Sequence, residues 1–103
     1  MKSRTVLLVA TFALGMSIAA MADGASIFKA KCAMCHGADG SGNSPMGKSM
    51  GLKDLGSAEV QSSSDTDLAA VISNGKGKMP AYKGKLSDSD ISDVVKYIRT
   101  LKK

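Results

Sequence analysis

The residues best suited to chemistry stand close together, because residues 32–36 read Cys-Ala-Met-Cys-His and contain both cysteines and the single histidine of the chain. Cys-x-x-Cys-His is the pattern at which a c-type haem is attached. The two thiols lie about one helical turn apart and can form thioethers along one haem edge, while the following histidine can bind the iron. The spacing therefore predicts a covalently bound haem, with Cys32 and Cys35 as its thioether residues and His36 as an iron ligand.

Two other uses of this motif have less support in the sequence. A thioredoxin-type redox pair requires a βαβ setting, and no such pattern surrounds residues 32–36. A zinc site requires a fourth ligand, and the chain has no further cysteine or histidine to supply it. Since both thiols would be used in thioethers, we expect no disulfide.

A second axial ligand has to come from another residue type. With no second histidine, the soft thioether of methionine is the expected ligand. Met34 lies inside the motif and cannot reach the opposite face of the ring. Met46 and Met50 follow closely in a glycine-rich loop, where a methionine more often fills space. The sequence favours Met79, which lies 43 residues beyond the histidine and directly before a stiffening proline, with Met46 and Met50 as the alternatives.

The beginning of the chain predicts export. Two basic residues precede an apolar run over residues 6–20, and alanines at positions 20 and 22 suit a signal peptidase. The alternative is an uncleaved membrane anchor, but the stretch over residues 6–22 is only 17 residues long, at the lower limit for spanning a bilayer. We expect a signal peptide over residues 1–22 that is cleaved after Ala22, a haem-binding domain over residues 23–103, and a periplasmic location.

The predicted domain is small for an independent fold. Its 81 residues include only three aromatic side chains, those of Phe28, Tyr82 and Tyr97. A chain this short has difficulty burying enough apolar surface by itself, so a haem would complete the core and the apoprotein should fold poorly. Twelve lysines and arginines against nine acidic residues make the domain mildly basic, and this excess is too small to indicate a nucleic-acid partner.

The hydrophobic pattern predicts an all-α fold, with three to four short helices around the haem. Gly24, Phe28 and the two cysteines share one face of the first helix, which leads into the motif. Residues 37–56 contain six glycines and show no helical or strand period, so we expect a loop that wraps one side of the haem. A single helical turn is weakly indicated over residues 57–63.

Two later helices have clear boundaries. One is expected to begin after a Ser64 cap and to end at an Asn-Gly pair. A loop over residues 75–86 follows. The last helix has a capping box formed by Ser87 and Asp90, and its apolar residues repeat at helical spacing from Ile91 to Leu101. No strand pattern is present.

Three segments together resemble the class I cytochromes c: Cys-Ala-Met-Cys-His-Gly at 32–37, Asn-Gly-Lys-Gly-Lys-Met-Pro-Ala-Tyr at 74–82, and Leu-Ser-Asp-Ser-Asp-Ile at 86–91. The likeness is greatest to the short, soluble bacterial and photosynthetic-lumen members and extends over residues 24–102. It implies a helical fold around one haem c in which the first and last helices cross. The resemblance also implies that Gly24 and Phe28 lie against the last helix near Tyr97.

The same resemblance implies a role for each residue of the site. It makes Cys32 and Cys35 the thioether residues, His36 the proximal ligand and Met79 the distal one. In the family a proline carbonyl accepts the Nδ1–H of the proximal histidine, and Pro45 is the candidate here. Such a bond would fix the tautomer and the orientation of the ligand.

An iron with both axial positions filled by protein has no site for a substrate, so we expect a one-electron carrier and not an enzyme. We expect a monomer without a permanent membrane anchor that carries electrons between exported or membrane-bound redox proteins. The alternatives are an electron-transfer subunit of a larger oxidoreductase, or a haem protein that reacts with small ligands or peroxide if Met79 does not hold the iron.

Lysines near Met79 suggest how partners are chosen. They can steer the protein toward an acidic docking patch, or they can be ordinary solvated side chains. These lysines are Lys76, Lys78, Lys83 and Lys85.

Overall fold

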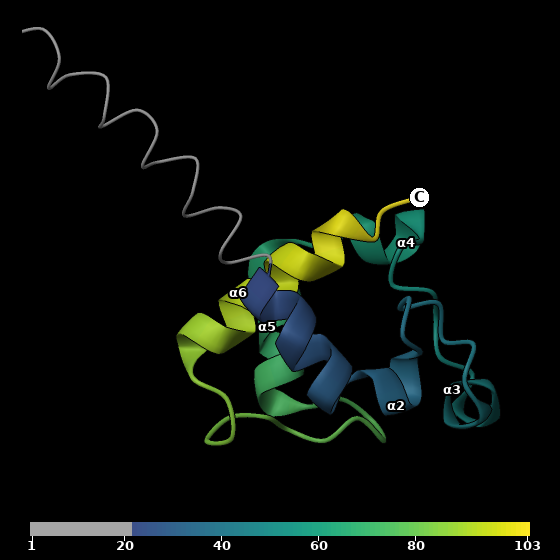
Figure 1. Ribbon diagram of the computed structural model, residues 1–103, viewed down its shortest axis with the longest axis horizontal. Helices are drawn as coiled ribbons and strands as arrows, with labels where there is room; N and C mark the ends of the chain where they lie inside the picture. The colour runs from purple at the N-terminus through teal and green to yellow at the C-terminus, as the bar shows by residue number, and fades with distance from the viewer. Residues whose placement is uncertain (1–21) are drawn as a thin grey trace, which may run out of the picture.

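The computed structural model describes residues 22–103, so the predicted signal peptide lies outside the described residues except for Ala22 and stays a prediction. The regular structure within this range is helical, apart from two isolated backbone bridges. Residues 22–31 are helical, and five helices follow: α2 (Ala33–His36), α3 (Pro45–Met50), α4 (Ala58–Gln61), α5 (Asp65–Asn74) and α6 (Asp88–Thr100) (Figure 1). The all-α expectation is confirmed, with more short helices than the three to four expected. None of the described helices is long and apolar enough to cross a membrane.

The core is built on one face of α6. Four residues of this helix are buried at helical spacing and cluster with Ile72 of α5: Ile91, Val94, Val95 and Ile98. Burial of each such side chain contributes about 1.5–3 kcal/mol. The predicted capping box is confirmed, since the Ser87 hydroxyl accepts the Asp90 N–H and the Asp90 carboxylate accepts the Ser87 N–H. Local capping and the apolar face therefore agree on where α6 begins and on how it packs.

The helix over residues 22–31 crosses α6 at a glycine (Figure 1). A side chain at Gly24 would collide with the backbone oxygen of Asp93. One turn later Phe28 is 1% exposed, and its ring centroid lies 5.2 Å from that of Tyr97. The crossing implied by the resemblance is confirmed, and it fixes the direction in which this helix leads into the cysteine motif.

Replacing Gly24 by alanine should destabilise the protein by about 1–2 kcal/mol, because the added methyl group has to push the two helices apart. The better helix propensity of alanine offsets part of this cost. Urea denaturation of the haem-loaded protein measures the difference. Ser26→Ala is the control, since Ser26 is exposed on the same helix; equal stability of the two variants would contradict a close crossing.

The expectation that residues 37–56 contain no helix is wrong, because α3 lies within this range. The Ser44 hydroxyl caps it by accepting the Gly47 N–H at 2.9 Å, and Pro45 occupies its first turn. Gly47 is the buried residue of α3, and a side chain there would collide with the backbone oxygens of Cys35 and Gly42. Since α3 packs through a glycine, it shows no apolar period that the sequence could reveal. The weakly indicated turn over residues 57–63 is present as α4.

The boundaries predicted for α5 are confirmed. The Ser64 hydroxyl accepts the Asp67 N–H at 3.0 Å, and the helix ends at Asn74. The following loop returns along α5, since the Tyr82 N–H donates to the Ile72 carbonyl at 3.0 Å. This return places Met79 beside the cysteine motif.

Candidate functional site

A cavity of about 550 Å³ lies beside the cysteine motif. Cys32, Cys35 and His36 line it from one side of the chain, and Met79 lines it from the loop after α5. The fold thus brings together four of the five predicted site residues, although Met79 is far from the others in sequence. Pro45 does not line the cavity.

The two thiols and the imidazole are held by continuous helical hydrogen bonding. The Cys32 N–H donates to the Phe28 carbonyl at 2.9 Å, which continues the helix over residues 22–31 into the motif. The His36 N–H donates in turn to the Cys32 carbonyl at 3.0 Å. Both cysteines are free thiols separated by about one turn, which is the spacing that two thioether bonds to one haem require.

The protonation of the thiols argues against a redox pair. Burial raises the pKa of Cys32, the neighbouring Cys35 adds to the rise, and together they bring it to about 11. Catalytic thiols of the thioredoxin type have lowered pKa values that supply a thiolate at neutral pH. The Cys32 environment is the opposite, so the structure favours attachment of a group over thiol–disulfide chemistry.

His36 has the form that a metal ligand needs. Burial lowers its pKa, so the imidazole is neutral at pH 7 and carries a free lone pair. Its Nδ1 atom is buried without a hydrogen-bond partner in the part of the chain that the structure describes. His36 itself lines the cavity.

The bond predicted from His36 Nδ1 to the Pro45 carbonyl is not formed in this structure. Pro45 is exposed at the start of α3. Its neighbour Ser44 links α3 to α2 instead, since the Ser44 hydroxyl donates to the Cys35 carbonyl at 2.6 Å. The buried Nδ1 nevertheless needs an acceptor, so Pro45 as that acceptor stays a prediction.

Met79 is held by a tight backbone turn. The Lys76 and Met79 N–H groups each donate to the other's carbonyl, at 3.1 and 2.9 Å. Gly77 makes this turn possible with a φ of +58°. The Tyr82 hydroxyl donates to the Lys31 carbonyl at 3.0 Å and so ties this loop to the helix over residues 22–31. These hydrogen bonds fix the backbone of the loop that contains Met79.

The other methionines differ in their access to the cavity. Met34 is 78% exposed, and Met46 is 48% exposed with its sulfur 3.9 Å from that of Cys35. Neither lines the cavity, whereas Met50 does. The sequence favoured Met79 and did not distinguish between Met46 and Met50 as alternatives to it. The structure distinguishes these two, because Met50 lines the same cavity as Met79 and Met46 does not.

The rest of the wall is apolar with a basic rim. Leu52, Leu55, Val71 and Tyr82 provide the apolar part. The sequence did not place these residues together in one wall, because they share no common spacing. Four lysines line the cavity: Lys31, Lys53, Lys76 and Lys78. Of the lysines that flank Met79 in the sequence, Lys76 and Lys78 are therefore at the cavity, whereas Lys83 and Lys85 are not. No carboxylate lines it within residues 22–103.

These features fit a haem. The volume is within the range of about 300–1,000 Å³ that cofactor sites occupy, the wall suits a flat apolar ring, and the lysines suit its two propionates. Two thiols, an imidazole and a thioether are the donor set that a c-type haem uses. A separate groove of about 450 Å³ between α5 and α6 contains none of the predicted site residues.

Known proteins with similar sequences bear on this site. A family model described as cytochrome c oxidase, cbb3-type, subunit III matches residues 19–98. The chain is 36% identical to the cytochrome c6 of Synechocystis sp. (strain ATCC 27184 / PCC 6803 / Kazusa), over 84% of the chain and 72% of that protein. It is 40% identical to the cytochrome c6 of Leptolyngbya boryana, over 75% of the chain and 87% of that protein. The structure of the KustC0563 c-type cytochrome is similar with a TM-score of 0.72 and 29% identity, and the match covers 78% of this chain and 98% of that one.

Proposed function

The chain belongs to the monohaem class I cytochromes c and is cytochrome c6-like, and on this basis we propose that it carries single electrons on one haem c held by Cys32, Cys35, His36 and Met79. Cytochromes c6 are electron carriers and not enzymes. The observation that supports the assignment of residues is that these four side chains, from two separate parts of the sequence, line one cavity.

Each side chain has a distinct task in this proposal. The thiols of Cys32 and Cys35 would form the covalent links, and the neutral imidazole of His36 would bind the iron. The thioether of Met79 would be the second protein ligand, and it would raise the reduction potential relative to a second histidine. A bound haem iron supplies the one-electron change. The apolar wall keeps water away from it, which disfavours added charge and limits the reorganisation that accompanies electron transfer.

Two related functions differ from this one in testable ways. A haem protein that reacts with small ligands would need an open iron position, and Met79 in the cavity wall argues against one. A permanent subunit of a larger oxidoreductase is the alternative suggested by the description of the matching family, cytochrome c oxidase, cbb3-type, subunit III. Size-exclusion chromatography of the exported protein distinguishes a diffusible carrier from a permanent subunit, since the carrier should elute as a monomer.

The basic rim leads to a prediction about partners. We propose that Lys76 and Lys78 steer the protein toward an acidic patch on exported or membrane-bound redox proteins, with the periplasm as their compartment. The second-order rate of electron transfer to an acidic partner should fall by about tenfold or more between low and high ionic strength. Replacing both lysines by glutamine should remove most of this dependence.

The matched control replaces Lys96 and Lys102 by glutamine, which also removes two positive charges, from exposed residues that do not line the cavity. Its salt dependence should stay close to that of the natural protein. A small neutral oxidant should react with all variants at the same rate. If the rate with the acidic partner does not fall with ionic strength, the lysines are merely solvated and steering is excluded.

A further inference from the structure

One side of the cavity wall is formed mainly by chain without regular secondary structure. It begins with Met50 at the end of α3 and continues through the non-helical segment before α4, where Gly51, Leu52, Lys53 and Leu55 line the cavity. The Leu52 N–H donates to the Gly47 carbonyl at 2.9 Å, and the Leu55 N–H donates to the Gly40 carbonyl at 2.8 Å. A segment with so few backbone bonds opens easily unless its other polar groups are also bound.

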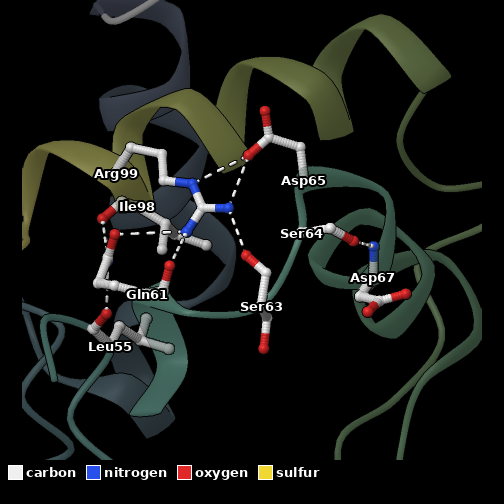
Figure 2. A network of polar contacts seen from close by, with 8 residues as sticks. All are labelled: Leu55, Gln61, Ser63, Ser64, Asp65, Asp67, Ile98 and Arg99. Carbon is white, nitrogen blue, oxygen red and sulfur yellow. Dashed lines mark hydrogen bonds and ion pairs between the residues drawn. The ribbon is translucent and has the colours of Figure 1, made fainter. Parts of the chain in front are cut away.

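The carbonyl of Leu55 is held from outside the cavity by Gln61 of α4 (Figure 2). The Gln61 Nε2 donates to the Leu55 carbonyl at 2.8 Å and to the Ile98 carbonyl of α6 at 3.0 Å. Both hydrogens of the amide are therefore used, and both acceptors are carbonyls, so the amide oxygen cannot take the place of the nitrogen. Because Ile98 is 5% exposed and belongs to the buried cluster around α6, Gln61 connects the wall to the hydrophobic core.

Arg99 of α6 in turn holds Gln61 (Figure 2). Its NH1 donates to the Gln61 carbonyl at 3.0 Å, and its NH2 donates to the Ser63 carbonyl at 2.6 Å. Its Nε and NH2 both reach one oxygen of Asp65, at 2.9 and 2.8 Å. A planar guanidinium can bind three groups in this fixed arrangement, whereas the ammonium of lysine cannot.

We propose that Gln61, held in place by Arg99, is a positioning residue for the electron-transfer site. It fixes Leu55 and the adjoining wall against the haem and keeps water out, although neither Gln61 nor Arg99 lines the cavity. This inference rests on the proposed function. Loosening the wall would admit water, which stabilises the more charged ferric form and therefore lowers the reduction potential.

Gln61→Met tests the proposal, because methionine keeps the length of the side chain and removes both donors. In the haem-loaded protein, hydrogen exchange of the Leu55 amide should become about tenfold faster or more. Exchange of the Tyr82 amide, which lies in the loop after α5, should change less. The reduction potential should fall, while the weak ferric absorption band at the red end of the spectrum that is expected for ligation by His36 and Met79 should be retained. Arg99→Lys should change the exchange and the potential in the same direction by a smaller amount.

Ser87→Ala is the matched control, since it removes the cap at the other end of α6 and costs about 1 kcal/mol. It should leave unchanged both the reduction potential and the ratio of the Leu55 amide exchange rate to that of Tyr82. A Gln61→Met potential equal to that of the natural protein, or a shift matched by Ser87→Ala, would overturn the proposal. If the natural protein lacks the band, the ligand assignment fails, and the Leu55 to Tyr82 exchange ratio still decides the role of Gln61.

Discussion

Replacing Met79 by alanine is expected to lower the reduction potential by on the order of 0.1 V or more, within the range of about 0.8 V that axial ligands span. It should also let carbon monoxide bind the ferrous iron. The reason is that a thioether favours the ferrous state and occupies the position that a small ligand needs. The backbone turn that holds Met79 uses main-chain atoms only, so the loop should keep its shape. A redox titration and a carbon monoxide difference spectrum measure the two effects.

Met50→Ala is the control for this experiment. Met50 lines the same cavity, so its removal creates a comparable gap without touching the proposed ligand. The potential should change little, and carbon monoxide should not bind. If the iron opens in the Met50 variant and not in the Met79 variant, the two methionines have the opposite roles.

Preventing haem attachment, by replacing Cys32 and Cys35 with alanine, is expected to abolish the native fold. An empty closed cavity of about 550 Å³ would cost at most about 13 kcal/mol at about 24 cal/mol per Å³. This value is comparable with the entire stability of a small domain, about 5–15 kcal/mol. A cost of about half this size would already exceed the lower end of that range, so the hydrophobic cluster around α6 should not keep the chain folded without haem. Near-ultraviolet circular dichroism should lose its signal, and thermal unfolding should lose its cooperativity.

Met34→Ala controls for a change within the same motif, since Met34 is 78% exposed. This variant should bind haem and unfold cooperatively at nearly the natural temperature. The prediction fails if the double cysteine variant, free of haem, shows a sharp unfolding transition and dispersed amide signals like those of the loaded protein. The core would then be sufficient without the cofactor.

The elements that could be predicted from the sequence are those with local signals. Ser87 and Asp90 have the spacing of a capping box, and the apolar residues that follow repeat at the period of a helix. The predictions of where α6 begins and of which face it buries are therefore both confirmed. The cysteine motif is equally local. It is sufficient to place three of the cavity-lining donors in one helical stretch.

The features that escaped prediction depend on contacts between distant residues. Helix α3 buries a glycine and no apolar stripe, so periodicity could not detect it. Met50 and Leu55 line the same cavity as Met79 because the chain folds back on itself. The spacing of these residues in the sequence does not indicate that they meet. Arg99 meets Gln61 across 38 residues. A lone glutamine and a lone arginine are ordinary surface residues in a sequence, and only the fold shows that they form one bridge.

The absorption spectrum of the exported protein tests the central claim most directly, once a pyridine haemochrome assay has shown whether the haem is linked by thioethers. We predict a low-spin spectrum with a weak ferric band at the red end, which is lost in Met79→Ala. A high-spin ferric spectrum in the natural protein, shifting on addition of cyanide, would contradict histidine–methionine ligation. The iron would then be open, and ligand binding or peroxide chemistry would replace electron transfer as the function.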